Sequence, residues 1–219
     1  MIITDLVQKG ESELYKVYIN DKYVCLLQAE TIVKNKIKKG QEIDIQTFDK
    51  IFYQSQILAC KNHAIMYVSK CLKTQKQVET YLKQKGYADE AIKNAIGALL
   101  EYGYLNDKYY AECFIKSKKS AKGINYIKNA LRLKGIKSDI IDEVTKNFES
   151  DLNDISLIAK KYLKSKQIDK NTKQKLFRHL LNKGFNFDEV NKVVNMFVKE
   201  GNDDWYWYFG SSKSKIFFG

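Results

Sequence analysis

Lysine dominates the chemistry available to this sequence, and it is concentrated in three stretches. Residues 114–138 contain eight basic residues and no acidic one, residues 155–187 contain nine against one, and residues 61–85 contain six against one. The whole chain of 219 residues has 38 Lys and Arg against 26 Asp and Glu, a net charge of +12. Ammonium groups bind anions, so the sequence predicts an anionic partner, and nucleic acid is the first candidate.

Twelve of these basic residues form the set that we expect to contact such a partner. They fall at the end of the first helix and along the second helix of each repeat defined below, where they would form a discontinuous positive ridge. The alternative is that they lie on ordinary solvated helix faces. The twelve are Lys73, Lys76, Lys116, Lys118, Lys119, Lys122, Lys128, Arg132, Lys134, Lys160, Lys161 and Lys164.

Residues that could catalyse a reaction or hold a metal are not arranged to do so. No G-x-x-x-x-G-K-[ST] loop is present, so we expect no nucleotide hydrolysis by the chain itself. His63 and His179 are not at ligand spacing from another candidate ligand, so no metal site is expected. The sequence predicts a binding protein without catalytic residues or cofactor, not an enzyme. Reduced, mostly buried thiols are expected at Cys25, Cys60, Cys71 and Cys113.

The basic stretches recur because the chain contains an internal repeat. Gly86, Gly135 and Gly184 lie 49 residues apart, and each follows an apolar-periodic segment that ends in Lys. Apolar positions around them repeat with the same offset, as Val78 and Ile127 do. A Gly directly after the last helical turn is the usual left-handed C-cap. Each of these glycines should therefore end the second helix of a three-helix unit.

Acidic residues open the third helix of each unit, at Asp89-Glu90, Ser138-Asp139 and Asp188-Glu189. Carboxylates suit a helix N-terminus. In a sequence-specific helix-turn-helix protein, however, the first residues of the helix after the turn meet the base edges, and carboxylates there would be repelled by phosphates. The sequence thus favours contact with an anionic backbone or groove through the first and second helices.

A small β-containing segment is expected ahead of the repeats. Residues 2–27 alternate between apolar and polar with period two, and Asn20-Asp21 predicts a two-residue hairpin turn. In that hairpin Tyr15, Val17 and Ile19 are expected on one face, and Lys22, Val24 and Leu26 are expected to face them from the other strand.

Further elements complete this first part of the chain. Residues 3–7 are expected to add a third strand, and residues 29–38 a short helix that stops at Gly40. Helical spacing begins at about residue 47, in one or two helices, and Thr74 with Gln77 predicts a capping box.

The expected fold class is all-α in the main, with three tandem three-helix, helix-turn-helix-like repeats in an elongated stack behind a small β-hairpin-containing cap. The aromatic and basic tail is expected to cover the last repeat or to be an appendage, with base stacking as the alternative. The segments are 1–51 (N-terminal cap), 52–106, 107–150 and 151–200 (repeats one to three) and 201–219 (C-terminal tail).

The amino terminus does not have a basic segment followed by an apolar core, and no stretch is long and apolar enough to cross a bilayer. The expected location is the cytoplasm, with no membrane partner.

With its repeats in place, the sequence resembles the RecX family, the regulatory proteins that act on the RecA recombinase. The resemblance rests on Gly103-Tyr104-Leu105-Asn106-Asp107 followed by Tyr110-Ala111, on Lys122-Gly123 and on Lys134-Gly135-Ile136. It covers most of the chain up to about residue 200. In place of the arginine-rich turn and Glu that the family often has before the second helix of the first repeat, this chain has Cys71-Leu72-Lys73-Thr74 and Gln77, and its aromatic tail is foreign to the family pattern.

This resemblance implies a right-handed stack of three-helix units that binds, as a monomer, along the groove of the RecA filament on DNA. It implies inhibition of ATP hydrolysis and strand exchange by RecA, and with them effects on homologous recombination, DNA repair and the SOS response. The implied partners are the RecA filament and single-stranded DNA, with double-stranded DNA as a further option. Two alternatives stay open: a general nucleic-acid-binding helical-repeat protein, and a helical scaffold for an acidic protein.

Overall fold

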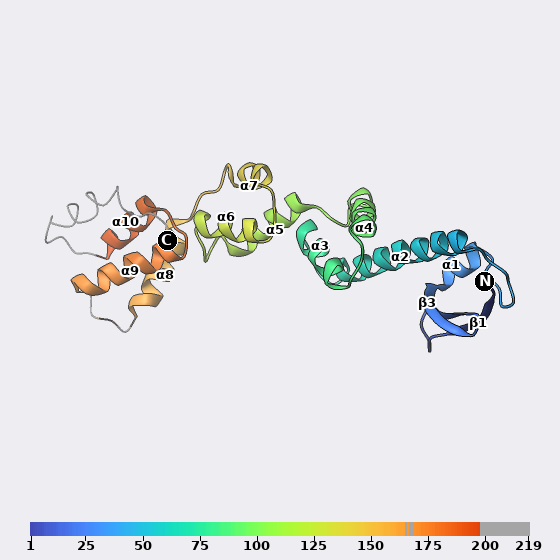
Figure 1. Cartoon of the computed structure of the whole chain (residues 1–219). Coiled ribbons are helices and arrows are strands. Elements are labelled where there is room, and N and C mark those ends of the chain that lie inside the picture. Colours follow the sequence, from blue (N-terminus) through green and yellow to red (C-terminus); the bar gives the residue numbers. More distant parts are fainter. Residues whose placement is uncertain (165, 167–168, 198–219) are drawn as a thin grey trace. The chain divides into compact units, whose positions relative to one another are not determined.

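The computed structural model describes residues 1–164, 166 and 169–197. These residues form three strands followed by helices (Figure 1), which confirms the mainly helical fold class. The predicted tail, 201–219, lies outside the described residues. The elements are β1 (Ile3–Gln8), β2 (Leu14–Ile19), β3 (Lys22–Gln28), α1 (Ala29–Lys34), α2 (Ile45–Val68), α3 (Gln75–Gln84), α4 (Asp89–Glu101), α5 (Asp107–Lys118), α6 (Ile124–Leu133), α7 (Ser138–Thr145), α8 (Leu152–Leu163), α9 (Lys170–Asn182) and α10 (Phe187–Met196).

The described residues divide into two compact units. Unit one comprises Met1–Glu112 and Leu131–Asp142, and unit two comprises Cys113–Ala130 and the described residues from Glu143 onward. The predicted limits of the five segments remain predictions.

The three strands form an antiparallel sheet in the order β1-β2-β3, so the predicted third strand is confirmed. Asn20 and Asp21 have φ angles of 47° and 62°, the left-handed conformation that a two-residue hairpin turn requires. The predicted pairing is confirmed for Ile19 and Lys22 but is wrong further from the turn: Val17 pairs with Cys25, and Val24 is 46% exposed. The reason is a β-bulge after Val17, because a shift of one residue moves every side chain of a strand to the opposite face.

Two helices follow the sheet, and the first of them is shorter than predicted. α1 ends at Lys34, four residues short of the expected end, and Lys36 follows with a φ of 50°, which a right-handed helix cannot contain. α2 is one helix that runs from Ile45 to Val68, through the expected limit between the cap and repeat one. Its first half packs on the sheet through Phe48 and Ile51, and its second half packs on α3 and α4 through Cys60 and Ala64.

The three glycines end the second helices as predicted. α3, α6 and α9 stop two residues before Gly86, Gly135 and Gly184, whose φ angles are 83°, 80° and 87°. Each third helix begins three residues after its glycine, with acids in its first turn. Apolar residues of the three helices of repeat three, among them Ile155, Leu176 and Val190, form one buried core.

Aspartate side chains cap the starts of α2 and α9, and protonation of these two carboxylates should weaken the helices. Asp44 accepts a hydrogen bond from the backbone N–H of Thr47 (2.8 Å), and Asp169 from that of Thr172 (2.7 Å). Hydrogen bonds with Thr47 and Thr172 hold the pKa values of the two carboxyls below their usual value of 3.8. Because the folded-state pKa is the lower one, each carboxylate stabilises the fold fully above pH 3.8, and this contribution is lost as the pH falls through the folded-state value.

Asp169→Asn should therefore remove part of the acid sensitivity of unit two while keeping a capping oxygen. The measurement is thermal unfolding of both proteins between roughly pH 2.5 and pH 6. The melting temperature of the unsubstituted chain should fall more steeply below pH 3.8 than that of the variant. Parallel curves would mean that the Asp169 cap does not contribute to acid unfolding.

Candidate nucleic-acid interface

Within unit one, the N-terminus of α3 meets the C-terminus of α6 at what we call the first junction. The Thr74 hydroxyl donates a hydrogen bond to the backbone oxygen of Lys134 (2.7 Å) and accepts one from the backbone N–H of Gln77 (3.2 Å). The Gln77 side chain in turn accepts from the Thr74 N–H (3.0 Å), so the predicted capping box is confirmed. Thr74 is fully buried, which makes this a specific contact between two repeats rather than a surface cap.

A column of lysines and tyrosines lies in the same unit. The rings of Tyr67 on α2 and Tyr81 on α3 stack with centroids 4.1 Å apart and planes 5° apart. Lys73 Nζ lies 4.6 Å from the Tyr67 centroid, and Lys85 Nζ lies 5.7 Å from that of Tyr81. A hydrogen bond with Cys71 raises the pKa of the Lys73 ammonium. The column therefore holds positive charge on both ends of a tyrosine pair.

Within unit two, the N-terminus of α6 meets the C-terminus of α9 at the second junction. The backbone N–H of Gly123 donates to the oxygen of Lys183, and that of Asn125 donates to the oxygen of Gly184, each at 3.0 Å. The Asn125 amide also donates to the Asn186 side chain (3.2 Å). A Cβ on Gly123 would lie 2.2 Å from the oxygen of Gly184, so only glycine allows this approach.

Positive side chains and aromatic rings also gather at the second junction. Lys122 Nζ lies 4.2 Å from the centroid of Tyr126, and Lys166 Nζ lies 3.2 Å from that of Tyr162. Tyr162 stacks on His179 with centroids 4.6 Å apart and planes at 28°. Burial lowers the pKa of His179, and the charges of Lys183, Lys166 and Lys122 lower it further.

The two junctions are built from equivalent positions of the repeat. An offset of 49 residues relates Lys73 to Lys122 and Lys134 to Lys183. Each junction therefore brings together two lysines from successive repeats. One lies just before the second helix of its repeat, and the other lies at the end of the second helix of the next repeat. Twice that offset relates Tyr81 to His179. Each of these two residues lies on the second helix of its repeat, and its ring stacks on a tyrosine of the first helix of the same repeat.

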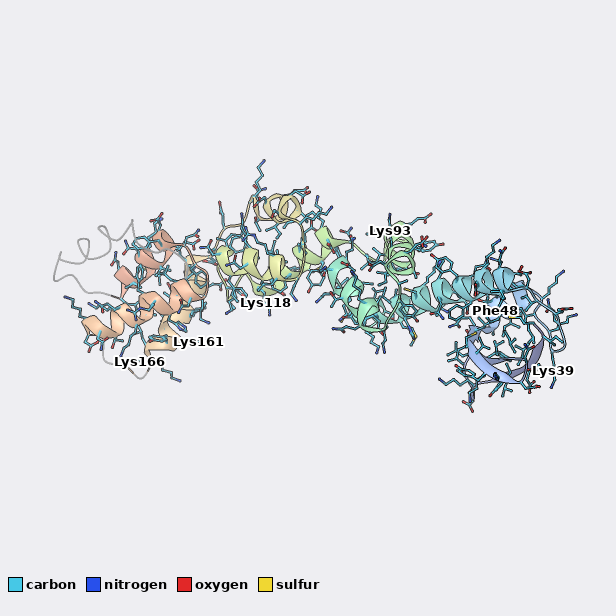
Figure 2. All side chains as sticks on the ribbon, viewed as in Figure 1. Lys39, Phe48, Lys93, Lys118, Lys161 and Lys166 are labelled. Atoms are coloured by element: carbon cyan, nitrogen blue, oxygen red, sulfur yellow. The ribbon has the colours of Figure 1, made fainter. Side chains whose placement is uncertain are left out.

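The twelve predicted residues fall into both units. Lys73, Lys76, Arg132 and Lys134 belong to unit one, and the other eight belong to unit two. Lys76 forms a salt bridge with Glu79 (3.2 Å), so part of its charge is neutralised within α3. Figure 2 labels two of the exposed members, Lys118 and Lys161. The remaining exposed members of unit two are Lys116, Lys119, Lys160 and Lys164, whereas Lys122 and Lys128 are half-buried.

The aromatic residues beside these lysines were not in the predicted set. Tyrosine spacing along a single helix does not reveal that Tyr67 and Tyr81 stack, because they come from different helices. The 49-residue offset could have identified Lys183, since Lys134 was already chosen. The full set that sequence reasoning missed is Tyr67, Tyr81, Lys85, Tyr110, Tyr126, Tyr162, Lys166, His179 and Lys183.

The side chains and helices of the described part of the chain bear on the expectations for metal ligands, membrane spans and thiols. The described residues contain no group of three His, Cys, Asp or Glu side chains that could hold a metal, and none of their helices is long and apolar enough to span a membrane. The thiols are free, but Cys71 is exposed and Cys113 is half-buried, so the expectation of mostly buried thiols is wrong for those two.

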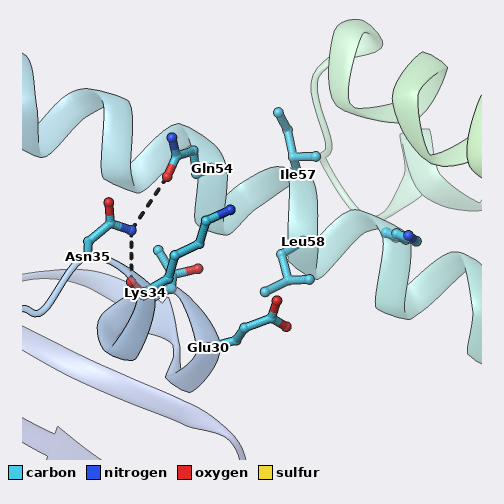
Figure 3. Close-up of a pocket in the computed structure, with 8 residues that line it drawn as sticks. Glu30, Lys34, Asn35, Gln54, Ile57 and Leu58 are labelled. Carbon is cyan, nitrogen blue, oxygen red and sulfur yellow. Dashed lines mark hydrogen bonds between the residues drawn. The ribbon is translucent and has the colours of Figure 1, made fainter.

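A cavity of about 240 Å³ lies between α1 and α2, lined by Lys34, Asn35, Gln54 and neighbouring residues (Figure 3).

Three-helix units that meet at lysine-bearing junctions define a tandem helical-repeat protein with basic contact surfaces. Family models for RecX match in the same order along the chain: the N-terminal domain at residues 1–44, and the first, second and third three-helix domains at 60–99, 106–144 and 155–194. The chain belongs to the RecX family.

Individual relatives agree with this assignment. The chain is 40% identical over 194 residues to "Regulatory protein RecX" of Clostridium perfringens (strain 13 / Type A), covering 86% of this chain and 92% of the relative. It is 35% identical over 195 residues to the protein of the same name from Clostridium botulinum (strain Alaska E43 / Type E3), with the same coverage. These relatives are named as regulatory proteins and not as enzymes.

Solved structures show the same fold. A crystal structure of a regulatory protein RecX matches with a TM-score of 0.67 over 89% of this chain and 98% of that one, at 20% identity. The crystal structure of RecX from Lactobacillus salivarius matches with a TM-score of 0.59 over 64% of this chain and 96% of that one, at 27% identity.

Proposed function

We propose that this chain is a regulator that binds filaments of the RecA recombinase on DNA and inhibits their ATP hydrolysis and strand exchange. It acts by binding, without catalysis of its own. Membership of the RecX family supports the regulatory role, and the lysine-bearing junctions support contact with an anionic partner.

One observation carries this proposal: three of the junction lysines carry charge that no salt bridge within the described residues neutralises. Lys39, Lys76 and Lys83 form salt bridges within the described part of the chain. Lys73, Lys122 and Lys183 form none with those residues, although each lies within or beside a contact between repeats. Lysines fixed at regular places without acidic partners favour binding to a regular array of negative charge.

The test is a titration of the protein into RecA filaments on single-stranded DNA while ATP hydrolysis is followed, with naked DNA as the comparison. Suppression below one molecule per RecA subunit is expected. Binding to naked DNA without suppression would instead favour a general nucleic-acid-binding protein. If neither occurs, the scaffold for an acidic protein becomes the better hypothesis.

Reversing four charges of unit two should weaken filament binding at least about tenfold, and the salt dependence of binding should become shallower, because fewer counterions are released. The changes are Lys116→Glu, Lys118→Glu, Lys119→Glu and Lys122→Glu. Affinity is measured at several salt concentrations, and circular dichroism checks that the helices are intact.

A control variant separates a local effect from the change in net charge. It reverses four exposed lysines of unit one that lie outside the predicted set: Lys22, Lys38, Lys50 and Lys93. Equal weakening by both variants would mean that net charge alone matters, and unchanged affinity of the first would remove these lysines from the interface.

A further inference from the structure

The second junction contains a concentration of positive charge beside stacked rings, and its parts come from three separate segments of unit two. Lys122 lies just before α6, Lys166 follows α8, and Lys183 ends α9. All three ammonium groups are close enough to the imidazole of His179 to lower its pKa. None of the three forms a salt bridge with the residues that the structure describes.

One acidic side chain beside this junction accepts a hydrogen bond from the backbone. Glu189, on α10, accepts a hydrogen bond from the backbone N–H of Asn186 (2.8 Å), where it completes the capping box of that helix. The backbone bond from Gly123 to Lys183 holds the neighbouring chain segments together. Like charges held at one place by backbone contacts attract an external anion, which relieves their repulsion.

An exposed aromatic ring adjoins this charge. Tyr126 is 36% exposed, and Lys122 Nζ lies 4.2 Å from its ring centroid. Its backbone position is fixed by close approach to Gly184, since a Cβ there would lie 2.3 Å from the Tyr126 nitrogen. Figure 2 labels Lys166, whose ammonium group lies over the Tyr162 ring that stacks on His179.

We propose that the cluster of Lys122, Lys166, Lys183, Tyr126 and His179 is a subsite for one segment of single-stranded nucleic acid, with a phosphate held by the lysines and an unpaired base stacked on Tyr126. Paired bases of a duplex cannot offer a face to this ring, whereas every unpaired base can. An acidic protein surface would satisfy the lysines, but carboxylate side chains are not attached to flat rings, whereas each nucleotide carries both a phosphate and a base. This subsite rests on the proposed function, because it identifies the DNA strand, not RecA, as what unit two contacts there.

The two histidines of the chain make this subsite directly observable by NMR. An oligothymidylate of about eight nucleotides is titrated into the full-length chain without RecA, and the imidazole Cε1–H signals are followed against pH. A bound phosphate favours the charged imidazolium, so the pKa of His179 should rise by roughly one unit. His63 belongs to unit one and hydrogen-bonds Tyr87 (2.6 Å), so its signal should not move.

Two variants test the parts of the subsite. Inorganic tripolyphosphate, which carries phosphate charge but no base, serves as a second probe. Tyr126→Leu should weaken oligothymidylate binding at least about fivefold, because stacking on the ring is lost. The same variant should leave the effect of tripolyphosphate on the pKa of His179 unchanged. Lys122→Gln with Lys183→Gln should weaken the binding of both probes. Lys22→Gln with Lys93→Gln, which removes the same charge from exposed positions of unit one, should weaken neither.

The subsite is overturned if His179 does not respond to oligothymidylate. It is also overturned if a hexaglutamate peptide moves His179 equally and Tyr126→Leu has no effect, since that result favours an acidic protein partner. RecA is absent from the NMR experiment, so the two proposals can fail separately. If the NMR signal responds but the filament titration shows no suppression, only the proposed function is rejected. If the filament titration shows suppression but the NMR signal does not respond, only the subsite is rejected.

Discussion

Gly123→Val should lower the free energy of unfolding of unit two by about 3 kcal/mol. Even a single Cβ at this position would lie 2.2 Å from the oxygen of Gly184 and 2.2 Å from the nitrogen of Phe185. Both atoms belong to the backbone, so no side-chain rotation can relieve the clash. The second junction would have to separate, and the bonds from Gly123 to Lys183 and from Asn125 to Gly184 would be lost with it.

The measurement is urea unfolding combined with hydrogen exchange of the backbone amides in α6 (Ile124–Leu133). Exchange at the start of α6 should accelerate more than exchange in α4, because repeat proteins lose stability mainly at the interface that is broken. Gly97→Ala is the matched control. Gly97 lies inside α4 with open space around the position of a Cβ, so this change should stabilise the helix by about 0.5–1 kcal/mol. An intact junction in the Gly123→Val variant would show that the contact is not tight in solution.

The features that the sequence predicts correctly are those set by a few neighbouring residues. The C-cap at Gly86 and the capping box of Thr74 and Gln77 depend on local backbone conformation, and the structure has both. The repeat extends this success, since one correctly interpreted unit predicts two more. The turn at Asn20-Asp21 was predictable for the same local reason.

Features that depend on long-range contacts could not be predicted in this way. The β-bulge after Val17 reverses the faces of β3, and no residue type in the alternating pattern indicates it. The stacking of Tyr162 on His179 joins two helices whose crossing is set by their shared core. Lysines are alike in sequence, yet Lys76 forms a salt bridge with Glu79 while Lys122 lies over a tyrosine ring. Charge counting therefore finds the basic stretches but not the members that remain available to a partner.

Thr74→Val should lower the free energy of unfolding of unit one by about 2 kcal/mol, because it removes one hydroxyl that serves two purposes. Valine has nearly the same shape as threonine, so the core packing around this fully buried residue should change little. The Gln77 N–H loses its acceptor at the start of α3, and the donor to the Lys134 oxygen is lost at the first junction. Such groups are costly to leave without a partner where water cannot reach them.

Two further variants make this result specific to the hydroxyl. Thr74→Ser keeps the oxygen and should retain most of the stability, and Thr80→Val makes the same chemical change at an exposed position of α3, where about 0.5 kcal/mol or less is expected. Urea unfolding measures all three. If Thr74→Val and Thr80→Val were equally stable, the hydroxyl would not hold the junction. If only Thr74→Val also weakens filament binding, the first junction positions Lys73 and Lys134 for contact with the partner, because the Thr74 hydroxyl joins the helix end that carries Lys134 to the start of α3.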